Sequence, residues 1–126
     1  MNPQWHAIET GLPAGPISWA TQAAGQVFTS HVPIRADGTF ELGQADVQVA
    51  LTFDNLLTAL VCAGCSQRDV VQVIVYLTDM QDAPVVHDVW TRYFQPPHPN
   101  RAIIGVADLG VPDMRIEIVA TAVQPA

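Results

Sequence analysis

Two charged side chains near the C-terminus have the chemistry and the surroundings of a functional site. Arg101 follows a proline-rich stretch and precedes an apolar run, and Glu117 lies inside a second apolar run. A guanidinium group binds a carboxylate through two parallel hydrogen bonds. A carboxyl group among apolar neighbours has its pKa raised by desolvation, which suits acid–base catalysis near neutral pH. Because a charge in such surroundings costs stability unless a partner or ligand compensates it, this pair is the leading candidate site.

Each of the two charges also has an interpretation without a function. Glu117 could form a structural ion pair with Arg115 or Arg101, and the residues alone weigh this interpretation equally against a catalytic role. For Arg101, an ordinary surface arginine is the commoner case. We expect the Arg101 side chain to project freely at the rim of a sheet, because prolines stiffen the chain before it and a strand follows it.

Hydrophobic periodicity predicts the elements that must position these residues. Apolar residues recur every three or four positions at 46–64 and 83–94, which predicts two helices, the first capped by Asp46 and stopped by Gly64. β-Branched and alternating runs predict strands at 5–9, 17–23, 26–32, 70–77, 102–106 and 114–123. The strands at 70–77 and 114–123 are apolar on nearly every position, as in strands buried on both faces. We therefore expect one α+β domain over residues 1–126, with two helices on one face of a mixed sheet.

The composition narrows the classes of partner. Of the 126 residues, 49% are hydrophobic and only 13% are charged, which predicts an oligomer that buries apolar surface. The net charge of −7 disfavours nucleic acid and anionic membranes as partners. We expect a cytoplasmic protein, because the sequence shows neither a leader-like segment nor an apolar run of about 20 residues.

The residue types also limit which cofactors the chain could bind. All 5 basic residues are arginines, so no lysine amine can form a Schiff base with a substrate or with pyridoxal phosphate. His6 and His98 fall in predicted loops and lack the spacing of metal ligands. Cys62 and Cys65 fit the end of a helix better than a redox pair. We expect no metal site.

One motif near the C-terminus is specific enough to identify a family. It is P-x-R-A-x-I-x-x-A-x-L at 99–109, followed after six residues by I-E-I at 116–118. Weaker agreements follow the same order along the chain, at 15–16, 28–30, 32–33, 54–55, 63–64 and 76–80. With these residues the chain resembles, over most of its length, the Rid proteins, also called YjgF and named for reactive intermediate deaminases.

The resemblance implies a fold, an assembly and an activity. The fold is chorismate-mutase-like, and a homotrimer packs its sheets into a central barrel with clefts at the subunit interfaces. The activity is cofactor-free hydrolysis of a carboxylated imine or enamine, such as 2-aminoacrylate or 2-iminopropanoate, to a 2-oxo acid and ammonia. Arg101 would hold the carboxylate of this small-molecule substrate, and Glu117 would position or activate the attacking water. Ser30 and Ile103 join Arg101 as predicted substrate-binding residues.

Three residues depart from the family's pattern. Ile17 stands where deaminating members have tyrosine, His31 where they have glycine, and His87 where they have asparagine. We expect all three to line the substrate cleft and to change its volume. The two histidines could act as a new general acid and base, or could be ordinary interior or surface residues.

Three functions remain open on the sequence. The leading one is the imine deaminase with Arg101 as carboxylate clamp and Glu117 as the base. The second is a relative that binds a small carboxylated metabolite without turning it over, which the loss of the tyrosine and the gain of His31 motivate. The third is a pathway-specific enzyme that acts on a bulkier or cyclic imine, which fits the altered cleft equally well.

Overall fold

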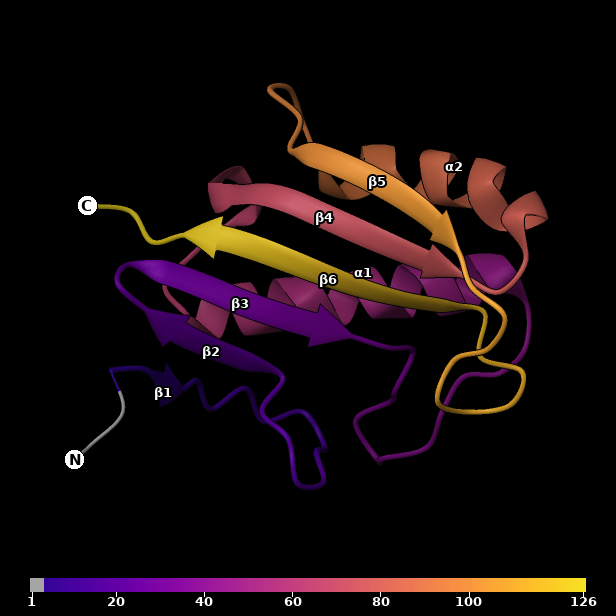
Figure 1. The fold of residues 1–126 in the computed structure, drawn as a ribbon, viewed down its shortest axis with the longest axis horizontal. Coiled ribbons are helices and arrows are strands. Elements are labelled where there is room, and N and C mark those ends of the chain that lie inside the picture. The colour runs from indigo at the N-terminus through magenta and orange to yellow at the C-terminus, as the bar shows by residue number, and fades with distance from the viewer. Residues whose placement is uncertain (1–3) are drawn as a thin grey trace.

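The computed structural model describes residues 4–126, and its core is a six-stranded mixed sheet with two helices on one face (Figure 1). The elements in chain order are β1 (His6–Ala7), β2 (Ala20–Ala23), β3 (Gln26–His31), α1 (Ala45–Cys62), η1 (Gln67–Asp69), β4 (Val70–Leu77), η2 (Met80–Asp82), α2 (Ala83–Tyr93), β5 (Asn100–Gly105) and β6 (Ile116–Val123). Across the sheet the strands run β1-β2-β3-β6-β4-β5, so the last strand lies between β3 and β4 and is antiparallel to both. The α+β prediction is confirmed.

The helix boundaries follow from the residues at their ends. α1 begins at Ala45 with Gln44 as its N-cap, so the prediction of Asp46 as the cap is wrong. Asp46 lies in the first turn instead, where the helix dipole still favours a carboxylate. The helix stops before Gly64, whose φ of +74° is a left-handed conformation that glycine adopts without steric cost, as predicted. Pro84 lies in the first turn of α2, where its missing N–H costs nothing.

The core forms between α1 and the helix-facing side of the sheet. Phe53, Leu56 and Leu60 of α1 are buried with Ile116 and Ile118 of β6 in one apolar cluster. α1 is long and apolar enough to cross a membrane, the one such helix among residues 4–126. Its apolar face here packs against β3 and β6.

The other side of the sheet, which we call the open face, carries no helix (Figure 1). Alternation along paired strands assigns to it Phe28, Ser30, Ile74, Tyr76, Ala102, Ile104, Glu117, Val119 and Thr121. Phe28 is 45% exposed and Ile104 is 43% exposed. The prediction that the central strands are buried on both faces is therefore wrong for a single chain. The pattern of a two-sided core is present, but only one side of it is covered within the chain.

Two strand boundaries bear on the candidate site. β2 begins at Ala20 and leaves Ile17 in the preceding loop, although the hairpin turn at Ala24 and Gly25, both with positive φ, is where the sequence predicts it. β5 begins at Asn100 and so contains Arg101, which pairs with Val73 of β4. The predicted position of Arg101 ahead of its strand is therefore wrong, and its backbone is fixed by the sheet.

Candidate functional site

Arg101 lies on the helix-facing side of β5 and contacts two residues of α2. Its Nη2 is 2.8 Å from Nδ1 of His87, and its Cζ lies 4.8 Å from the centre of the Trp90 ring. Arginine has only donors, so His87 accepts at Nδ1, and its neutral ring carries the hydrogen on Nε2. The indole face attracts the guanidinium charge. The expected free projection of Arg101 is therefore wrong, because its side chain is held against α2.

A pocket of about 410 Å³ surrounds this contact, and we call it the arginine pocket. It is lined by His87, Trp90, Thr91, His98, Pro99 and Arg101. Partial burial lowers the pKa of Arg101, but a guanidinium remains protonated at any working pH. Ile103 shares this side of β5, yet it packs on the core and is not among the lining residues. The arginine pocket thus offers charge and hydrogen-bond donors.

Glu117 lies on the open face, opposite Tyr76 of β4. Among the described residues its carboxylate has no ion pair and no hydrogen bond. Arg115 instead donates to Asp82 through Nε at 2.7 Å and Nη2 at 3.0 Å. Arg101 is bound to His87, so neither arginine supports the structural ion pair that the sequence left open. Burial raises the pKa of Glu117, as expected for a carboxyl group without a cation.

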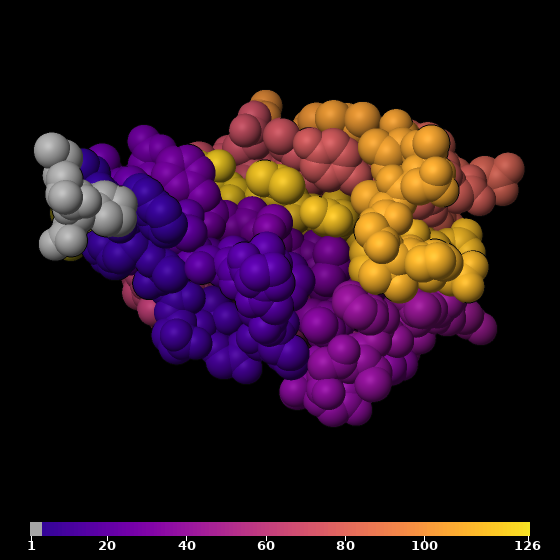
Figure 2. All heavy atoms as spheres, turned by 60° about the horizontal axis from the view of Figure 1, so that its bottom comes forward, coloured from indigo at the N-terminus to yellow at the C-terminus, as the bar shows by residue number. Residues whose placement is uncertain are grey.

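A second pocket, the glutamate pocket, opens beside Glu117 and has a volume of about 490 Å³. Three loops build it, and Figure 2 shows the loop before β6 next to the segment that follows β3 and beside the N-terminal segment. Its lining residues are Pro13, Ala14, Gly15, Pro16, Ile17, Trp19, Val32, Ile34, Gly38, Phe40, Gly110, Val111, Met114 and Glu117. Glu117 is the one ionisable side chain in this set.

Hydrogen bonds hold the loops of the glutamate pocket in place. Trp19 donates from Nε1 to the carbonyl of Pro13 at 2.7 Å, which ties the N-terminal loop to the start of β2. Asn55, buried on α1, donates from Nδ2 to the carbonyls of Val32 at 3.0 Å and Ile34 at 2.9 Å. These bonds satisfy polar groups and tie the pocket walls to one another and to α1.

The remaining predicted residues are divided between the pocket, the open face and the interior. Ile17 lines the glutamate pocket, and Ser30 lies on the open face opposite Val119. His31 is only 1% exposed, and its ring stacks on Trp19 at 6.2 Å between centroids. Both ring nitrogens of His31 lack a hydrogen-bond partner among the described residues, and burial lowers its pKa to about 3.

The structure does not place His31 in the cleft, contrary to expectation. It alternates with Val27 and Thr29 on the buried side of β3, a pattern that the sequence already contains. Sequence reasoning also missed Trp19 and Phe40 as pocket walls. These residues fall in or near loops, where no periodicity marks them.

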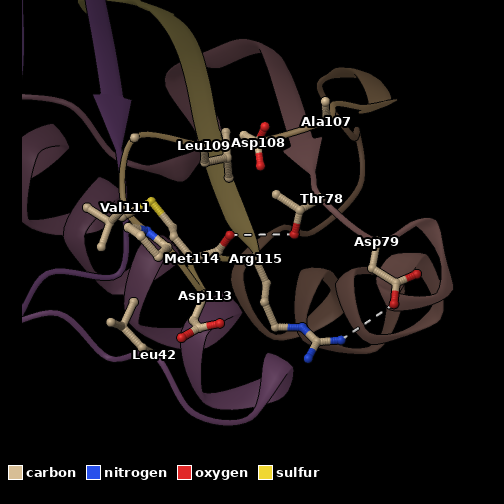
Figure 3. Close-up of a pocket in the computed structure, with 12 residues that line it drawn as sticks. Leu42, Thr78, Asp79, Ala107, Asp108, Leu109, Val111, Asp113, Met114 and Arg115 are labelled. Carbon is tan, nitrogen blue, oxygen red and sulfur yellow. Dashed lines mark hydrogen bonds and ion pairs between the residues drawn. The ribbon is translucent and has the colours of Figure 1, made fainter.

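A third pocket, of about 670 Å³, lies under the loop that precedes β6 (Figure 3). It contains none of the predicted site residues. Its cation, Arg115, is bonded to Asp82 and lies 3.8 Å from Asp79, so its charge is balanced. No cluster of three or more histidine, cysteine or acidic residues that could hold a metal ion occurs in residues 4–126. The expectation of no metal site stays a prediction.

Comparison with known proteins identifies the family. The sequence model described as Endoribonuclease L-PSP matches residues 8–124, nearly the whole chain. The chain belongs to the Rid (YjgF) family. The Rid relative 2-iminobutanoate/2-iminopropanoate deaminase of Dermatophagoides farinae is 32% identical over 108 residues, which are 84% of each chain. A RutC family protein of Pyrococcus horikoshii is 35% identical over 113 residues, which are 87% of this chain and 88% of that protein.

Solved structures agree with the Rid fold. The crystal structure of Escherichia coli TdcF with bound serine matches with a TM-score of 0.86 and 28% identity, over 95% of this chain and 99% of the other. The family and the fold predicted from the sequence are thus confirmed. Because a relative is named as a deaminase, we expect this Rid protein to be an enzyme.

Within one Rid chain, the two leading residues do not meet. Arg101 lies on the helix-facing side of an edge strand, and Glu117 lies on the open face in a different pocket. The structure brings Arg101 together with His87, and it brings Glu117 together with Ile17. Any site that uses both charges on one small molecule needs a second copy of the chain.

Proposed function

We propose that this Rid protein hydrolyses a carboxylated imine, or its enamine tautomer, to a 2-oxo acid and ammonia. The site would form between the arginine pocket of one copy and the glutamate pocket of another. The observation that carries this proposal is the division of the required groups between opposite faces of the sheet. A relative named 2-iminobutanoate/2-iminopropanoate deaminase and a TdcF structure with bound serine, itself a carboxylated molecule, support the substrate class.

Arg101 is suited to hold the substrate carboxylate. A guanidinium has five N–H donors, and His87 takes one of those on Nη2. Enough donors remain for a two-bond contact with a carboxylate. The Trp90 face beneath the guanidinium limits its motion. A clamp that is fixed before binding loses less side-chain entropy when the substrate arrives.

Glu117 is suited to activate water. Its carboxylate takes a proton from the water as the oxygen attacks the imine carbon, and the resulting carboxyl group passes this proton to the nitrogen. The tetrahedral intermediate then loses ammonia when the carbon–nitrogen bond breaks, which leaves the 2-oxo acid. Burial raises the pKa of Glu117, and this makes its carboxylate a stronger base. The reaction balances with water alone, so the proposal needs no cofactor.

The assembly in this proposal is the homotrimer that the family resemblance implies. Its barrel would cover the apolar open face, including Phe28, Val119 and Ile104, which one chain leaves exposed. It would also join the two pockets across each interface. The trimer and the predicted cytoplasmic location stay predictions.

Two functions outside imine hydrolysis are weaker fits. The matched family's description names an endoribonuclease, but a net charge of −7 repels an RNA backbone, and Arg35 and Arg115 are already paired with carboxylates. One observation favours non-catalytic binding of a carboxylated metabolite. Ile17 provides no polar group beside Glu117, whereas deaminating members have a tyrosine at this position. A pathway-specific enzyme for bulkier or cyclic imines remains the other alternative within the same chemistry.

The test measures 2-oxo acid and ammonia release from 2-imino acids made in situ by an amino-acid oxidase with catalase. We expect the pure protein to accelerate hydrolysis above the spontaneous rate, and Arg101→Met to lower kcat/KM by about a hundredfold or more. Arg92→Met, an exposed arginine on α2 that is not part of either pocket, is the matched control and should keep full activity. Absence of acceleration would reject the deaminase, and tight 2-oxo acid binding without turnover would favour the binding function.

A further inference from the structure

We infer that the substrate of this chain is a 2-imino acid whose bulky apolar side chain lies in the glutamate pocket. The inference rests on the proposed hydrolysis and specifies which imines it takes. The geometry beside Glu117, rather than the chemistry of the imine group, carries it. A 2-imino acid with a small side chain, such as 2-iminopropanoate, would leave most of this pocket empty.

The position of the side chain follows from the position of the reacting carbon. The imine carbon carries the nitrogen, the carboxylate and the side chain. If Glu117 delivers water to that carbon, the side chain begins one covalent bond, about 1.5 Å, from the point of attack. The pocket that adjoins Glu117 within one chain is the one of about 490 Å³. With the carboxylate drawn to Arg101 of another copy, the side chain is directed along these walls.

The chemistry of the walls selects an apolar group. Apart from Glu117, the lining side chains are aliphatic, aromatic, thioether or absent. The indole N–H of Trp19 is the one side-chain donor in this set, and it is used by the Pro13 carbonyl. A polar side chain would therefore lose its hydrogen bonds to water and find no replacement. An apolar side chain would be transferred from water to an apolar surface, which is favourable.

The base of the glutamate pocket is part of a packed apolar cluster. Val32, Ile34 and Met114 form a second buried apolar cluster, against which Trp19 and Phe40 pack. An antiparallel bridge joins Ile34 to Phe40, which closes the loop after β3. A rigid apolar surface binds a complementary group without the entropy loss of ordering its own loops.

Ile17 at the rim gives an independent indication. It is 52% exposed in the chain, in a loop where no core packing requires a large apolar residue. It stands where the family resemblance places a tyrosine, so the rim is here more apolar than in the deaminating members. A bulky apolar substrate would cover it.

The test compares imines derived from alanine, leucine and phenylalanine in the coupled oxidase assay. We expect kcat/KM for the leucine or phenylalanine imine to exceed that for the alanine imine by about tenfold or more. Ile17→Asn should lower this ratio several-fold, and Val61→Asn should leave it unchanged. Val61 is the matched control because it is an exposed apolar residue at the far end of α1, outside the pocket. Calorimetry with pyruvate, 4-methyl-2-oxopentanoate and phenylpyruvate measures the same preference without turnover.

The outcomes separate this inference from the proposed function. Hydrolysis of the alanine imine at a rate equal to or above that of the larger imines overturns the inference and leaves the deaminase intact. Failure to hydrolyse any imine rejects the deaminase, and calorimetry then decides the pocket. Tighter binding of the larger 2-oxo acids upholds the apolar pocket, whereas equal binding, tighter pyruvate binding or no binding overturns it.

Discussion

The arginine pocket and the glutamate pocket differ in almost every physical property. The first is the more polar of the two, lies against α2 on the helix-facing side and has its cation oriented by an imidazole and an indole ring. The second is apolar, lies beside the open face and contains one carboxyl group without a cation. In the first, the charge is kept available for a ligand. In the glutamate pocket, burial raises the pKa of Glu117.

This difference explains why the proposed site needs both pockets. A carboxylated imine needs a fixed positive charge at one end and a base in apolar surroundings at its carbon. If both groups shared one pocket, Arg101 would pair with Glu117 and lower the pKa that burial raises. In the proposed site, separation on opposite faces would keep the two groups apart until two copies of the chain bring them together around a substrate.

Mixing two inactive variants gives the largest expected effect and tests this separation directly. Arg101→Met and Glu117→Gln should each lower kcat/KM by about a hundredfold or more. Co-refolding equal amounts should recover roughly a quarter of the wild-type rate, because a quarter of randomly assembled interfaces combine an intact arginine with an intact glutamate. The rate of 2-oxo acid formation before and after mixing measures this recovery.

The control mixture pairs Arg101→Met with the double variant Arg101→Met/Glu117→Gln. No chain in it supplies Arg101, so it should stay inactive. If the first mixture also stays inactive while each variant remains folded and assembled, both residues act from the same copy. The two pockets would then not be halves of one site.

The sequence predicts the elements better than it predicts the contacts between them. β4 is predicted residue for residue, and both helices are predicted to within two residues at each end, because local periodicity and end residues decide them. The partner of Arg101 was not predictable in this way. His87 and Trp90 share one face of α2, and only the packing of that helix on β5 brings them to the arginine.

The two histidines near the pockets show the same limit. Alternation on β3 is enough to bury His31, since every second residue from Val27 onward faces the core. Nothing local distinguishes His87, on an exposed helix face, from a surface histidine. Its role depends on the 2.8 Å contact with Arg101. His31 thus bears on the stability of the fold, and His87 bears on the orientation of Arg101.

His31 should make the protein sensitive to mild acid. Its pKa is lowered from 6.5 to about 3 by burial, so the unfolded chain binds a proton between these pH values and the folded chain does not. Stability is therefore complete above pH 6.5 and is lost as the pH falls towards 3. At pH 5 the loss should be about 2 kcal/mol, roughly thirtyfold in the folding equilibrium. Urea unfolding at pH 7.5 and pH 5 measures it.

His31→Phe keeps a ring against Trp19 and should remove most of this difference between the two pH values. His98→Asn is the matched control, because His98 is exposed and should leave the difference unchanged. A wild-type protein equally stable at both pH values would show that the interior accepts the imidazolium, for instance through water bound to its unpartnered nitrogens.

The smallest expected effect concerns the orientation of Arg101. His87→Leu removes the acceptor, so the guanidinium gains freedom, and KM for the carboxylated substrate should rise about tenfold with kcat little changed. His87→Asn offers an amide oxygen near the position of Nδ1 and should keep KM close to that of the wild type. His98→Asn, which changes another residue of the arginine pocket, should retain the wild-type KM. Equal KM values for the leucine and asparagine variants would show that Trp90 alone orients Arg101. The arginine pocket would then differ from the glutamate pocket in charge, but not in how its charged group is positioned.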